Sequence, residues 1–303
     1  MTAIETTKLT KRYGKETALD ELDLQIERGE IFGFLGPNGA GKSTTIDIFL
    51  DFIRPSDGHA TISDADPQQS PLTVRQNIGV LPDDYSLYDS LTGSEHLQLA
   101  KDLNDSNEDT DGLLSRIGLA NAGDQPVGSY SKGMVQRLAF GMALVGDPDV
   151  LILDEPSTGI DPNGVQDMRD LIQEEADSGT TVFFSSHILQ QVESICDRVA
   201  IVNDGKLVAV DTISGLRRTF DTHSVLMLSV DEPPTGLDLD ELDGVSQVEY
   251  SDKTITVSLN NPQLKSTVIS RVEDSGMSVS NIEINEASLT EMFQRLTTGG
   301  DTE

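Results

Sequence analysis

The sequence predicts an α/β fold with a largely parallel sheet, followed by a smaller second domain of the α+β class. Short apolar runs typical of buried strands alternate with helical patterns through most of the first 211 residues. A glycine-rich loop at 36–43 connects one of these runs directly to a helical pattern. From about residue 220 the order changes to three strands, a helix, a strand and a final helix. We therefore expect two domains, 1–219 and 220–303.

The start of the chain has the alternation of apolar and polar residues that is typical of strands. Residues 2–35 contain three such runs, IETTKLTKRY, ALDELDLQIERGE and IFGFL, and the first two suggest an antiparallel addition to the main sheet. The pattern of KSTTIDIFLDFI predicts a helix at 42–53. Two short strands are then expected, in GHATISD and in NIGVL at 77–81.

The middle of the chain is helical before it returns to the α/β pattern. From about 94 to 145 the segments LTGSEHLQLAKDL, TDGLLSRIGL and GMVQRLAFGMALV have helical spacing. VLILD at 150–154 is an apolar run typical of a strand that is buried on both faces. The elements expected after it are a helix at 162–178, a strand at 181–185, a helix at 188–194, and strands at 198–203 and 206–211.

The C-terminal domain has its own set of elements. SVLMLSV, VSQVEY and KTITVSL predict strands, with the turn-rich segment PPTGLDLDELDG between the first two. A helix near 262–275 and a strand near 278–284 follow, and ASLTEMFQRLT at 287–297 predicts an amphipathic helix. No catalytic constellation is apparent in this domain, and regulation, dimerisation and contact with a partner remain open as its role.

The chain is strongly acidic. Its 303 residues carry 52 acidic and 21 basic side chains, a formal net charge of −31. Such a polyanion is repelled by nucleic acid phosphates and by anionic lipid surfaces, so we expect no nucleic acid partner. Blocks of five or six like charges are absent, which argues against an acidic tail. Aspartate exceeds glutamate and lysine is scarce, a surface that resembles those of salt-loving microbes.

Two further features bear on where the protein works. Cys196 is the single cysteine, which excludes an internal disulfide framework and fits a reducing compartment. No run approaches the roughly 20 apolar residues of a membrane helix, and the first residues lack the apolar core of a secretory signal. The sequence therefore predicts a cytoplasmic protein.

A phosphate-binding loop is the strongest motif in the sequence. It fits the pattern G-x-x-x-x-G-K-[ST] and lies between the strand IFGFL and a helix, as this motif requires. Glycines let the backbone wrap around a phosphate with its N–H groups inward, and the helix N-terminus adds partial positive charge. We expect Lys42 to reach the β- and γ-phosphates and Ser43 to hold Mg²⁺. The expected nucleotide-binding residues here are Gly36, Pro37, Asn38, Gly39, Ala40, Gly41, Lys42, Ser43 and Thr44.

A pair of carboxylates ends the apolar strand VLILD. Adjacent acids at the carboxyl end of a strand lie in the ligand crevice of an α/β sheet. We expect Asp154 to bind Mg²⁺ and Glu155 to orient and polarise the attacking water. Acidic pairs at strand ends are common in so acidic a chain, so this prediction depends on the phosphate-binding loop.

The order of further motifs resembles that of the ATP-binding cassette (ABC) ATPases. YSKGMVQR at 130–137 looks like the family signature, and EPSTGID at 155–161 looks like the D-loop, with Asp161 as its acid. His187, directly after TVFFSS, matches the switch histidine, and Tyr13 matches the aromatic residue that stacks on adenine. The resemblance covers about residues 3–215, and it is greatest to the cassette subunits of the ABC-2 type exporter group. Together with the acidic composition it points to a halophilic archaeon as the source.

The resemblance implies a fold and a mechanism. The first domain would be a P-loop NTPase cassette with a RecA-like core, an antiparallel β addition and a helical subdomain at about 86–145. Two cassettes, identical or related, would dimerise head to tail, with Ser131 and Gly133 of one contacting the γ-phosphate on the other. His187 would bond this phosphate. ATP hydrolysis would power a separate ABC-2 type permease, bound near residues 86–100 on the inner face of the membrane, for export.

Two departures from the family pattern are present. Lys132 and Met134 stand where the family signature has glycine and glutamine. Lys132 adds charge near the phosphate or is solvated, and both interpretations stay open. Asp83 stands at the place of the family's metal-sensing glutamine, with Asp84 as the alternative register and a plain polar turn as the other interpretation. We expect Asp83 to reach Mg²⁺ or its water.

Other functions compete with transport. Soluble ABC ATPases that act on nucleic acid or ribosomes commonly carry two cassettes or a coiled-coil insertion, whereas this chain has one cassette and an unfavourable charge. A GTPase or small-molecule kinase is disfavoured because the guanine-reading N-K-x-D element is absent. A nucleotide-binding regulator without turnover is the better rival, because the signature is altered and Asp83 replaces glutamine.

Overall fold

The computed structural model of the chain describes residues 1–219, 224–234, 237–259 and 264–285. The chain divides into two units, Met1–Ile213 and Ser214–Glu303. The sequence places the boundary at residue 219, six residues later, at the far end of helix α8 (Ile213–Thr219). The predicted boundary thus falls at the end of this helix, whereas the structure divides the chain at its start.

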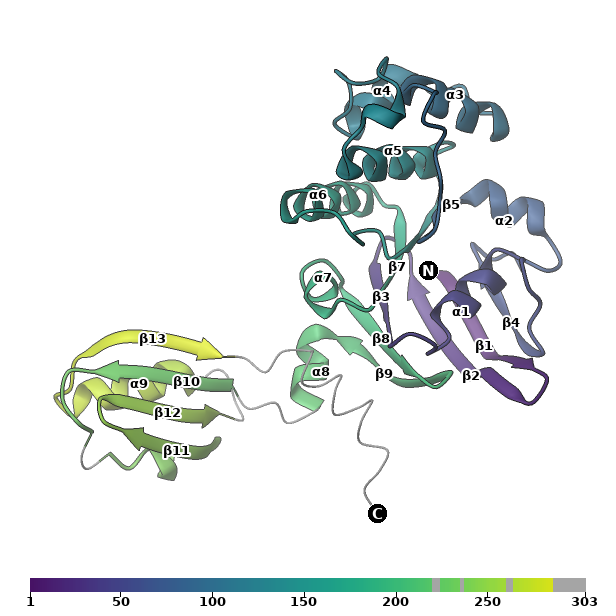
Figure 1. Cartoon of the computed structure of the whole chain (residues 1–303). Coiled ribbons are helices and arrows are strands. Elements are labelled where there is room, and N and C mark those ends of the chain that lie inside the picture. The colour runs from purple at the N-terminus through teal and green to yellow at the C-terminus, as the bar shows by residue number, and fades with distance from the viewer. Residues whose placement is uncertain (220–223, 235–236, 260–263, 286–303) are drawn as a thin grey trace. The chain divides into compact units, whose positions relative to one another are not determined.

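A six-stranded sheet forms the centre of the first unit (Figure 1). Five neighbouring strands run parallel, and β9 joins β8 antiparallel at one edge, which confirms the prediction of a largely parallel sheet. The carboxyl ends of the parallel strands therefore meet at one edge of the sheet, where ligands bind in α/β folds. The strand order is β5 (Ile78–Leu81), β6 (Val150–Asp154), β7 (Thr181–Ser186), β3 (Ile31–Leu35), β8 (Arg198–Asn203) and β9 (Lys206–Thr212).

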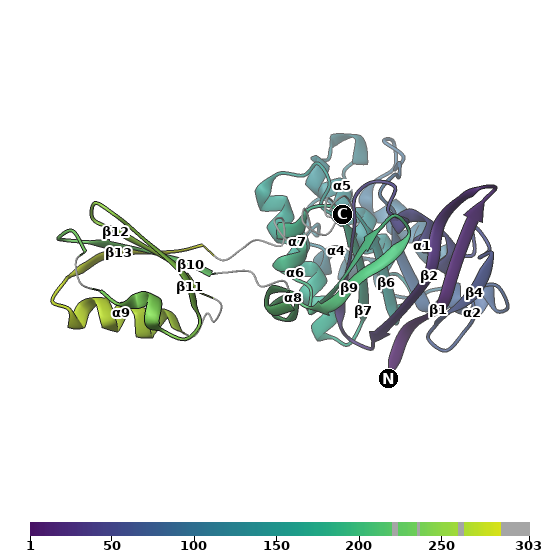
Figure 2. The same cartoon turned by 90° about the horizontal axis from the view of Figure 1, so that it is seen from below.

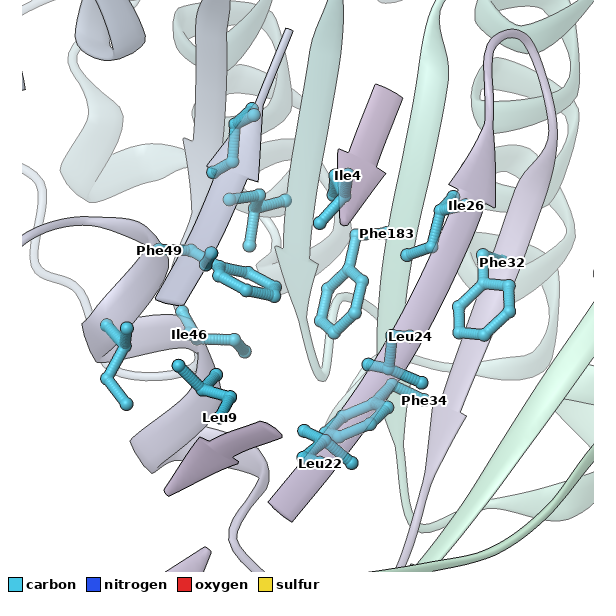
Figure 3. Packing of buried hydrophobic residues seen from close by; sticks show 14 of the residues in the cluster. Ile4, Leu9, Leu22, Leu24, Ile26, Phe32, Phe34, Ile46, Phe49 and Phe183 are labelled. Carbon is cyan, nitrogen blue, oxygen red and sulfur yellow. The ribbon is translucent and has the colours of Figure 1, made fainter. Parts of the chain in front are cut away.

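The antiparallel addition is a separate three-stranded sheet. Its order is β2 (Glu16–Glu27), β1 (Thr2–Tyr13) and β4 (Asp57–Ile62). The two sheets and helix α1 (Lys42–Phe49) enclose a core in which Phe183 is surrounded by aliphatic and aromatic side chains (Figure 3). The Phe49 ring meets Phe183 edge-on at 5.5 Å between centroids, a favoured arrangement of aromatic rings. This packing fixes α1, and with it the end of the phosphate-binding loop, against the central sheet.

Three helices gather at one end of the first unit and correspond to the predicted helical segment (Figure 1). The first of them begins with a capping box between Thr92 and Glu95, which satisfies backbone donors at the helix start. The Arg116 guanidinium forms a bidentate ion pair with Glu175, which is 3% exposed, and so connects these helices to the core. The helices are α3 (Gly93–Leu103), α4 (Thr110–Arg116) and α5 (Lys132–Leu144), with a 3₁₀ turn at Val127–Ser129.

The remaining helices of this unit differ in places from the prediction. Helix α1 ends at Phe49, four residues before the predicted end, because Asp51 takes a left-handed backbone conformation. Helix α2 (Pro71–Asn77) was not predicted from the sequence, because it is short, buries Val74 alone and therefore lacks a periodic apolar pattern. The other two are α6 (Pro162–Asp177) and α7 (Leu189–Glu193).

Cys196 lies in the interior of this unit. Its side chain is 8% exposed, and a Cβ added to Gly33 of β3 would lie 3.0 Å from its Sγ. Burial raises the pKa of the Cys196 thiol, with a smaller contribution from the charge of Asp197. The residue behaves as a small apolar core side chain, as free cysteines commonly do.

The second unit is a four-stranded antiparallel sheet with a helix on one face (Figure 2). Val268 and Val272 of α9 (Lys265–Asp274) pack with buried strand residues such as Leu226 and Leu228. The helix predicted at 287–297 lies outside the described residues. The sheet order is β11 (Val245–Ser251), β12 (Thr254–Leu259), β10 (Ser224–Val230) and β13 (Val279–Asn285), with a 3₁₀ turn at Leu239–Glu241. Across the described chain, no helix is both long and apolar enough to cross a bilayer.

Candidate functional site

The phosphate-binding loop connects β3 to α1, as the motif predicts. Every residue of β3 is buried, so the strand holds the start of the loop in the core. Gly41 has φ of 103°, a left-handed conformation that glycine adopts without steric cost. A Cβ on Gly36 would lie 2.6 Å from the carbonyl oxygen of Val202, so this position is restricted to glycine by close packing. The two ends of the loop are therefore held by close packing against the fold, at Gly36 and at Gly41.

Lys42 folds back over this loop. Its Nζ donates to the carbonyl oxygen of Gly36 at 2.7 Å, and its side chain is almost fully buried. Burial lowers the pKa of Lys42, and the carboxylates of Glu155, Asp154 and Asp83 act in the opposite direction. The structure thus brings the loop lysine and all three predicted carboxylates into one electrostatic neighbourhood.

Asp154 ends β6 beside the neighbouring strand β7. Its Oδ1 accepts a short hydrogen bond from the Ser185 hydroxyl, the residue paired with it in the sheet. Burial raises the pKa of Asp154, and the charges of Asp83 and Glu155 add to this effect, while Ser185 and Lys42 oppose it. A carboxylate held among other acids in a partly buried position is suited to bind a cation, because the cation relieves both penalties.

Glu155 and His187 form a hydrogen-bonded pair at the ends of adjacent strands. The Nδ1 of His187 lies 2.8 Å from Oε1 of Glu155, so this nitrogen carries the proton when Glu155 is ionised. Glu155 has φ of 50°, and its N–H donates to the carbonyl oxygen of Ser185 at 3.1 Å. Nine other described non-glycine residues, Asp51 among them, also have a positive φ, so this conformation alone does not mark Glu155 as functional. The side chain of Glu155 is 10% exposed and that of His187 is 48% exposed, so the pair faces solvent through the histidine.

A pocket of about 740 Å³ joins Tyr13 to the phosphate-binding loop. Tyr13 is half-exposed at the end of β1, and the Nζ of Lys11 lies 5.0 Å from the centroid of its ring. An aromatic ring at one end and N–H donors at the other match the base and the phosphates of a nucleotide. The sequence motifs do not mark the pocket residues that come from turns and strand starts: Glu16, Thr17, Ala18 and Asp204.

Asp83 follows β5 at the same edge of the sheet. Its charge raises the pKa of Asp154 and acts on that of Lys42, although its own side chain is exposed. Asp83 thus lies within electrostatic reach of Asp154 and Lys42, and its contact with Mg²⁺ stays a prediction, with Asp84 as the alternative register.

The residues of the signature and D-loop begin helices. The Ser131 hydroxyl accepts the N–H of Met134 at 3.3 Å and caps α5, and Asp161 accepts the N–H of Gly164 at 2.9 Å and caps α6. A Cβ on Gly133 would meet no described atom within 4 Å, so this face of the helix is open. Ser131, Gly133 and Asp161 are not among the described residues that line the pocket of their own chain. This separation is what the head-to-tail arrangement requires.

Lys132 lies against the D-loop. A Cβ on Gly159 would overlap the Nζ of Lys132, so the lysine passes directly over this glycine. Lys132 is also exposed to solvent, so both interpretations of it, added charge near the phosphate and a solvated side chain, stay open.

Replacing Asp154 by Asn is expected to stabilise the protein free of ligands and to abolish its metal-dependent turnover. Because folding raises the pKa of this carboxyl, its contribution to stability is greatest below the pKa of the unfolded chain and is lost as the pH rises through the folded value. The gain in unfolding free energy from the variant should therefore appear at neutral pH and vanish at low pH. Urea unfolding with EDTA measures it, with the exposed Asp170→Asn as control. A less stable D154N protein at neutral pH would contradict this.

The chain is similar over nearly its whole length to resistance and transport ATP-binding proteins. It matches the ABC transporter family over residues 19–158. It is 32% identical to the daunorubicin/doxorubicin resistance ATP-binding protein DrrA of Streptomyces peucetius, over 97% of this chain and 92% of that protein. It is 34% identical to the bacitracin transport ATP-binding protein BcrA of Bacillus licheniformis, over 99% and 98% of the two chains.

A solved structure has the same cassette fold. That of cbiO1 from Clostridium perfringens, part of the ABC transporter complex cbiONQ, has a TM-score of 0.65 and 26% identity. The likeness covers 73% of this chain and 94% of the other. The sheet topology, the phosphate-binding loop and the relatives matched over nearly their whole length all indicate the same family. The chain belongs to the ABC transporter family as an ATP-binding subunit with the ATPase activity of that family.

Proposed function

We propose that the chain binds ATP with Mg²⁺, hydrolyses it in a head-to-tail dimer of cassettes, and powers export through a separate ABC-2 type permease. The observation that carries this proposal is the meeting of Lys42, Asp154 and the Glu155–His187 pair at one edge of the sheet. These groups supply a phosphate cradle, a cation site and a base held by a histidine, which together are the requirements for phosphoryl transfer to water.

Each group has a role in this proposal. The backbone N–H groups of residues 36–44 and Lys42 hold the phosphates, and the Tyr13 ring stacks on adenine. Asp154, Asp83 and Ser43 offer oxygen ligands for Mg²⁺, which neutralises charge on the phosphates when bound. Glu155 accepts a hydrogen bond from the attacking water and polarises it. His187 orients Glu155 and bonds the γ-phosphate.

The second half of the site comes from another cassette. Ser131 and Gly133 lie at the N-terminus of α5, where the helix dipole and free N–H groups favour an anion. We place the γ-phosphate of the other subunit there, with Asp161 of the D-loop beside the dimer interface. The partner cassette is a second copy of this chain or a related one.

Export is proposed because related proteins carry it in their names. The relatives include resistance and transport ATP-binding proteins, and a fluoroquinolones export ATP-binding protein of Mycobacterium tuberculosis (strain CDC 1551 / Oshkosh) is 40% identical over 69% of this chain and 70% of that protein. We place the chain on the inner face of the cell membrane, with residues 86–100 against the permease. In this stretch Tyr88 is 64% exposed, as a docking surface requires.

Extraction of native membranes with mild detergent tests the membrane role. We expect the chain to be recovered with one multi-span membrane protein, identified by mass spectrometry, and its ATP turnover to change in that complex. Tyr88→Glu should release the chain from the membranes. Phe52→Glu, which changes an equally exposed ring on another surface, should leave it bound. Recovery of the wild-type chain without a membrane protein would contradict the proposal.

A regulator without turnover is the competing function. The Glu155–His187 hydrogen bond favours hydrolysis over regulation, because a purely nucleotide-binding protein has no need for a glutamate that a histidine orients beside the phosphate-binding loop. A salt-dependent association with ribosomes would favour the nucleic acid class instead, which the net charge of −31 opposes.

The acidity points to a salty solvent, and we propose a halophilic archaeal origin for this surface. Salt at about 1 M reduces the Debye length to roughly 3 Å and so screens the repulsion among surface acids. We expect the melting temperature, followed by circular dichroism, to fall when potassium chloride is lowered from molar concentration to about 0.1 M. An unchanged melting temperature would contradict salt adaptation.

A further inference from the structure

Helices α3, α4 and α5, with the 3₁₀ turn at Val127–Ser129, form a helical group. The segment that follows Asp83 forms its hydrogen bonds with this helical group and not with the sheet. In the loop between β5 and α3, the carbonyl oxygen of Leu91 accepts the N–H of Val127 at 2.8 Å. The carbonyl oxygen of Asp89 accepts the N–H of Gly128 at 3.0 Å. The N–H of Tyr88 donates to Nε2 of the buried His96 in α3 at 3.0 Å. The second half of the loop is therefore part of the helical group.

The first half of this loop, residues 83–87, is held to the rest of the described chain by a hydrogen bond from Tyr85. Its hydroxyl donates to Oε1 of Gln136 at 2.7 Å, and this is the one hydrogen bond that residues 83–87 make with other described residues. Gln136 is 6% exposed, so its amide oxygen has lost contact with water and needs the tyrosine as its donor. Burial raises the pKa of Tyr85 to about 12, so the hydroxyl keeps its proton at physiological pH.

The bond joins two parts of the nucleotide site that belong to different groups of elements. Tyr85 is two residues beyond Asp83, whose charge acts on Lys42 and Asp154 at the edge of the sheet. Gln136 lies in α5, the helix whose N-terminus is capped by Ser131. The hydrogen bond between Tyr85 and Gln136 therefore connects the metal side of the site, at Asp83, to the helix that carries the signature residue Ser131.

We propose that Tyr85 is a positioning residue, whose hydrogen bond to Gln136 fixes Asp83 relative to the signature end of α5. The inference rests on the proposed function, because it concerns turnover at that site. The Tyr85 hydroxyl touches neither nucleotide nor water in this role. It holds the carboxylate of Asp83 at a fixed position relative to α5, so the metal side of the site stays coupled to the signature end of this helix.

Tyr85→Phe tests the proposal, because it removes one oxygen atom and keeps the ring. Tyr250→Phe is the control, since it removes a tyrosine hydroxyl that donates to the carbonyl oxygen of Leu237 at 2.9 Å in the second unit. We expect Y85F to lower kcat roughly fivefold, the size of effect of one lost hydrogen bond that leaves a buried amide oxygen unpaired. The KM for ATP should not change, because Lys42 and the phosphate-binding loop are untouched. Y250F should match the wild-type protein in both kcat and KM.

Amide hydrogen exchange of the protein without nucleotide gives a readout that is independent of activity. Exchange at residues 83–87 should increase in Y85F and stay at the wild-type level in Y250F. A merely structural role would lower the unfolding free energy and raise this local exchange, but would leave kcat unchanged. Equal kcat in Y85F and wild type, or an equal fall in Y250F, would overturn the proposal.

A double variant makes the test sharper. Tyr85→Phe with Gln136→Met removes both partners, so no unpaired buried group remains, and its kcat should be no lower than that of Y85F alone. Effects that multiply would show that the two side chains act independently and would overturn the inference. Failure of the proposed function looks different, because the wild-type protein itself would then show no ATP turnover.

Discussion

Replacing Glu155 by Gln is expected to reduce ATP turnover by about 10³-fold, within the range for loss of a general base. The amide has the shape of the carboxylate but cannot accept a proton from water or polarise it through a negative charge. ATP binding should persist, because the loop and Lys42 that hold the phosphates are unchanged. The variant should therefore accumulate as a dimer with ATP trapped inside it.

Three measurements separate this result from simple misfolding. Steady-state hydrolysis gives kcat, fluorescent nucleotide titration gives the affinity for ATP, and size-exclusion chromatography with ATP reports the dimer. Glu174→Gln, the same change at an exposed position of α6, should behave like the wild-type protein. Equal turnover in E155Q and wild type would remove Glu155 from its role, and the hydrogen bond between Glu155 and His187 would need another explanation.

Mixing two inactive variants is expected to restore ATP hydrolysis, because the proposed head-to-tail dimer shares each active site between two chains. Lys42→Ala damages the phosphate side, and removing this buried charge should weaken ATP binding roughly 100-fold. Gly133→Asp damages the signature side by placing a carboxylate against the γ-phosphate, again at a cost of roughly 100-fold. Aspartate is tolerated in the isolated chain, since a Cβ there meets no described atom within 4 Å and the first turn of a helix favours an acid.

The mixed dimer contains one intact site and one doubly damaged site. With equal amounts of both variants, roughly half of the dimers are mixed and each has one of two sites working, so about a quarter of wild-type activity should return. Lys42→Ala alone, Gly133→Asp alone, and a mixture containing the double variant K42A/G133D with wild type provide the controls. A mixture of the two single variants that stays inactive would contradict the head-to-tail dimer.

The elements that the sequence predicted well are those whose signal is local. The phosphate-binding loop is a run of consecutive residues between a strand and a helix, and β6 ends at Asp154, as the apolar run VLILD indicated. The left-handed glycines of the loop follow from the motif itself, since no other residue adopts that conformation freely. Helix α2 was missed because it buries one side chain and so has no period to detect.

Features that arise between distant segments could not be predicted from the pattern. His187 and Glu155 were each expected at strand ends, but their hydrogen bond depends on β6 and β7 being neighbours in the sheet. Glu16 and Asp204 enter the nucleotide pocket from separate hairpins, and no local signal marks them. The hydrogen bond from Tyr85 to Gln136 joins residues 51 apart in the sequence, and no sequence motif indicates this bond.

The buried position of the lone cysteine has a practical consequence for the study of the transport cycle. Cys196 is enclosed by core side chains and its thiol pKa is raised, so thiol reagents should react with it slowly in the folded protein. The natural chain should therefore take up little maleimide dye or nitroxide spin label, so an introduced cysteine can be labelled selectively. A cysteine introduced at exposed Leu103 in α3 and another at exposed Phe52 would carry probes whose separation reports, by energy transfer or pulsed resonance, how the helical group moves when nucleotide binds.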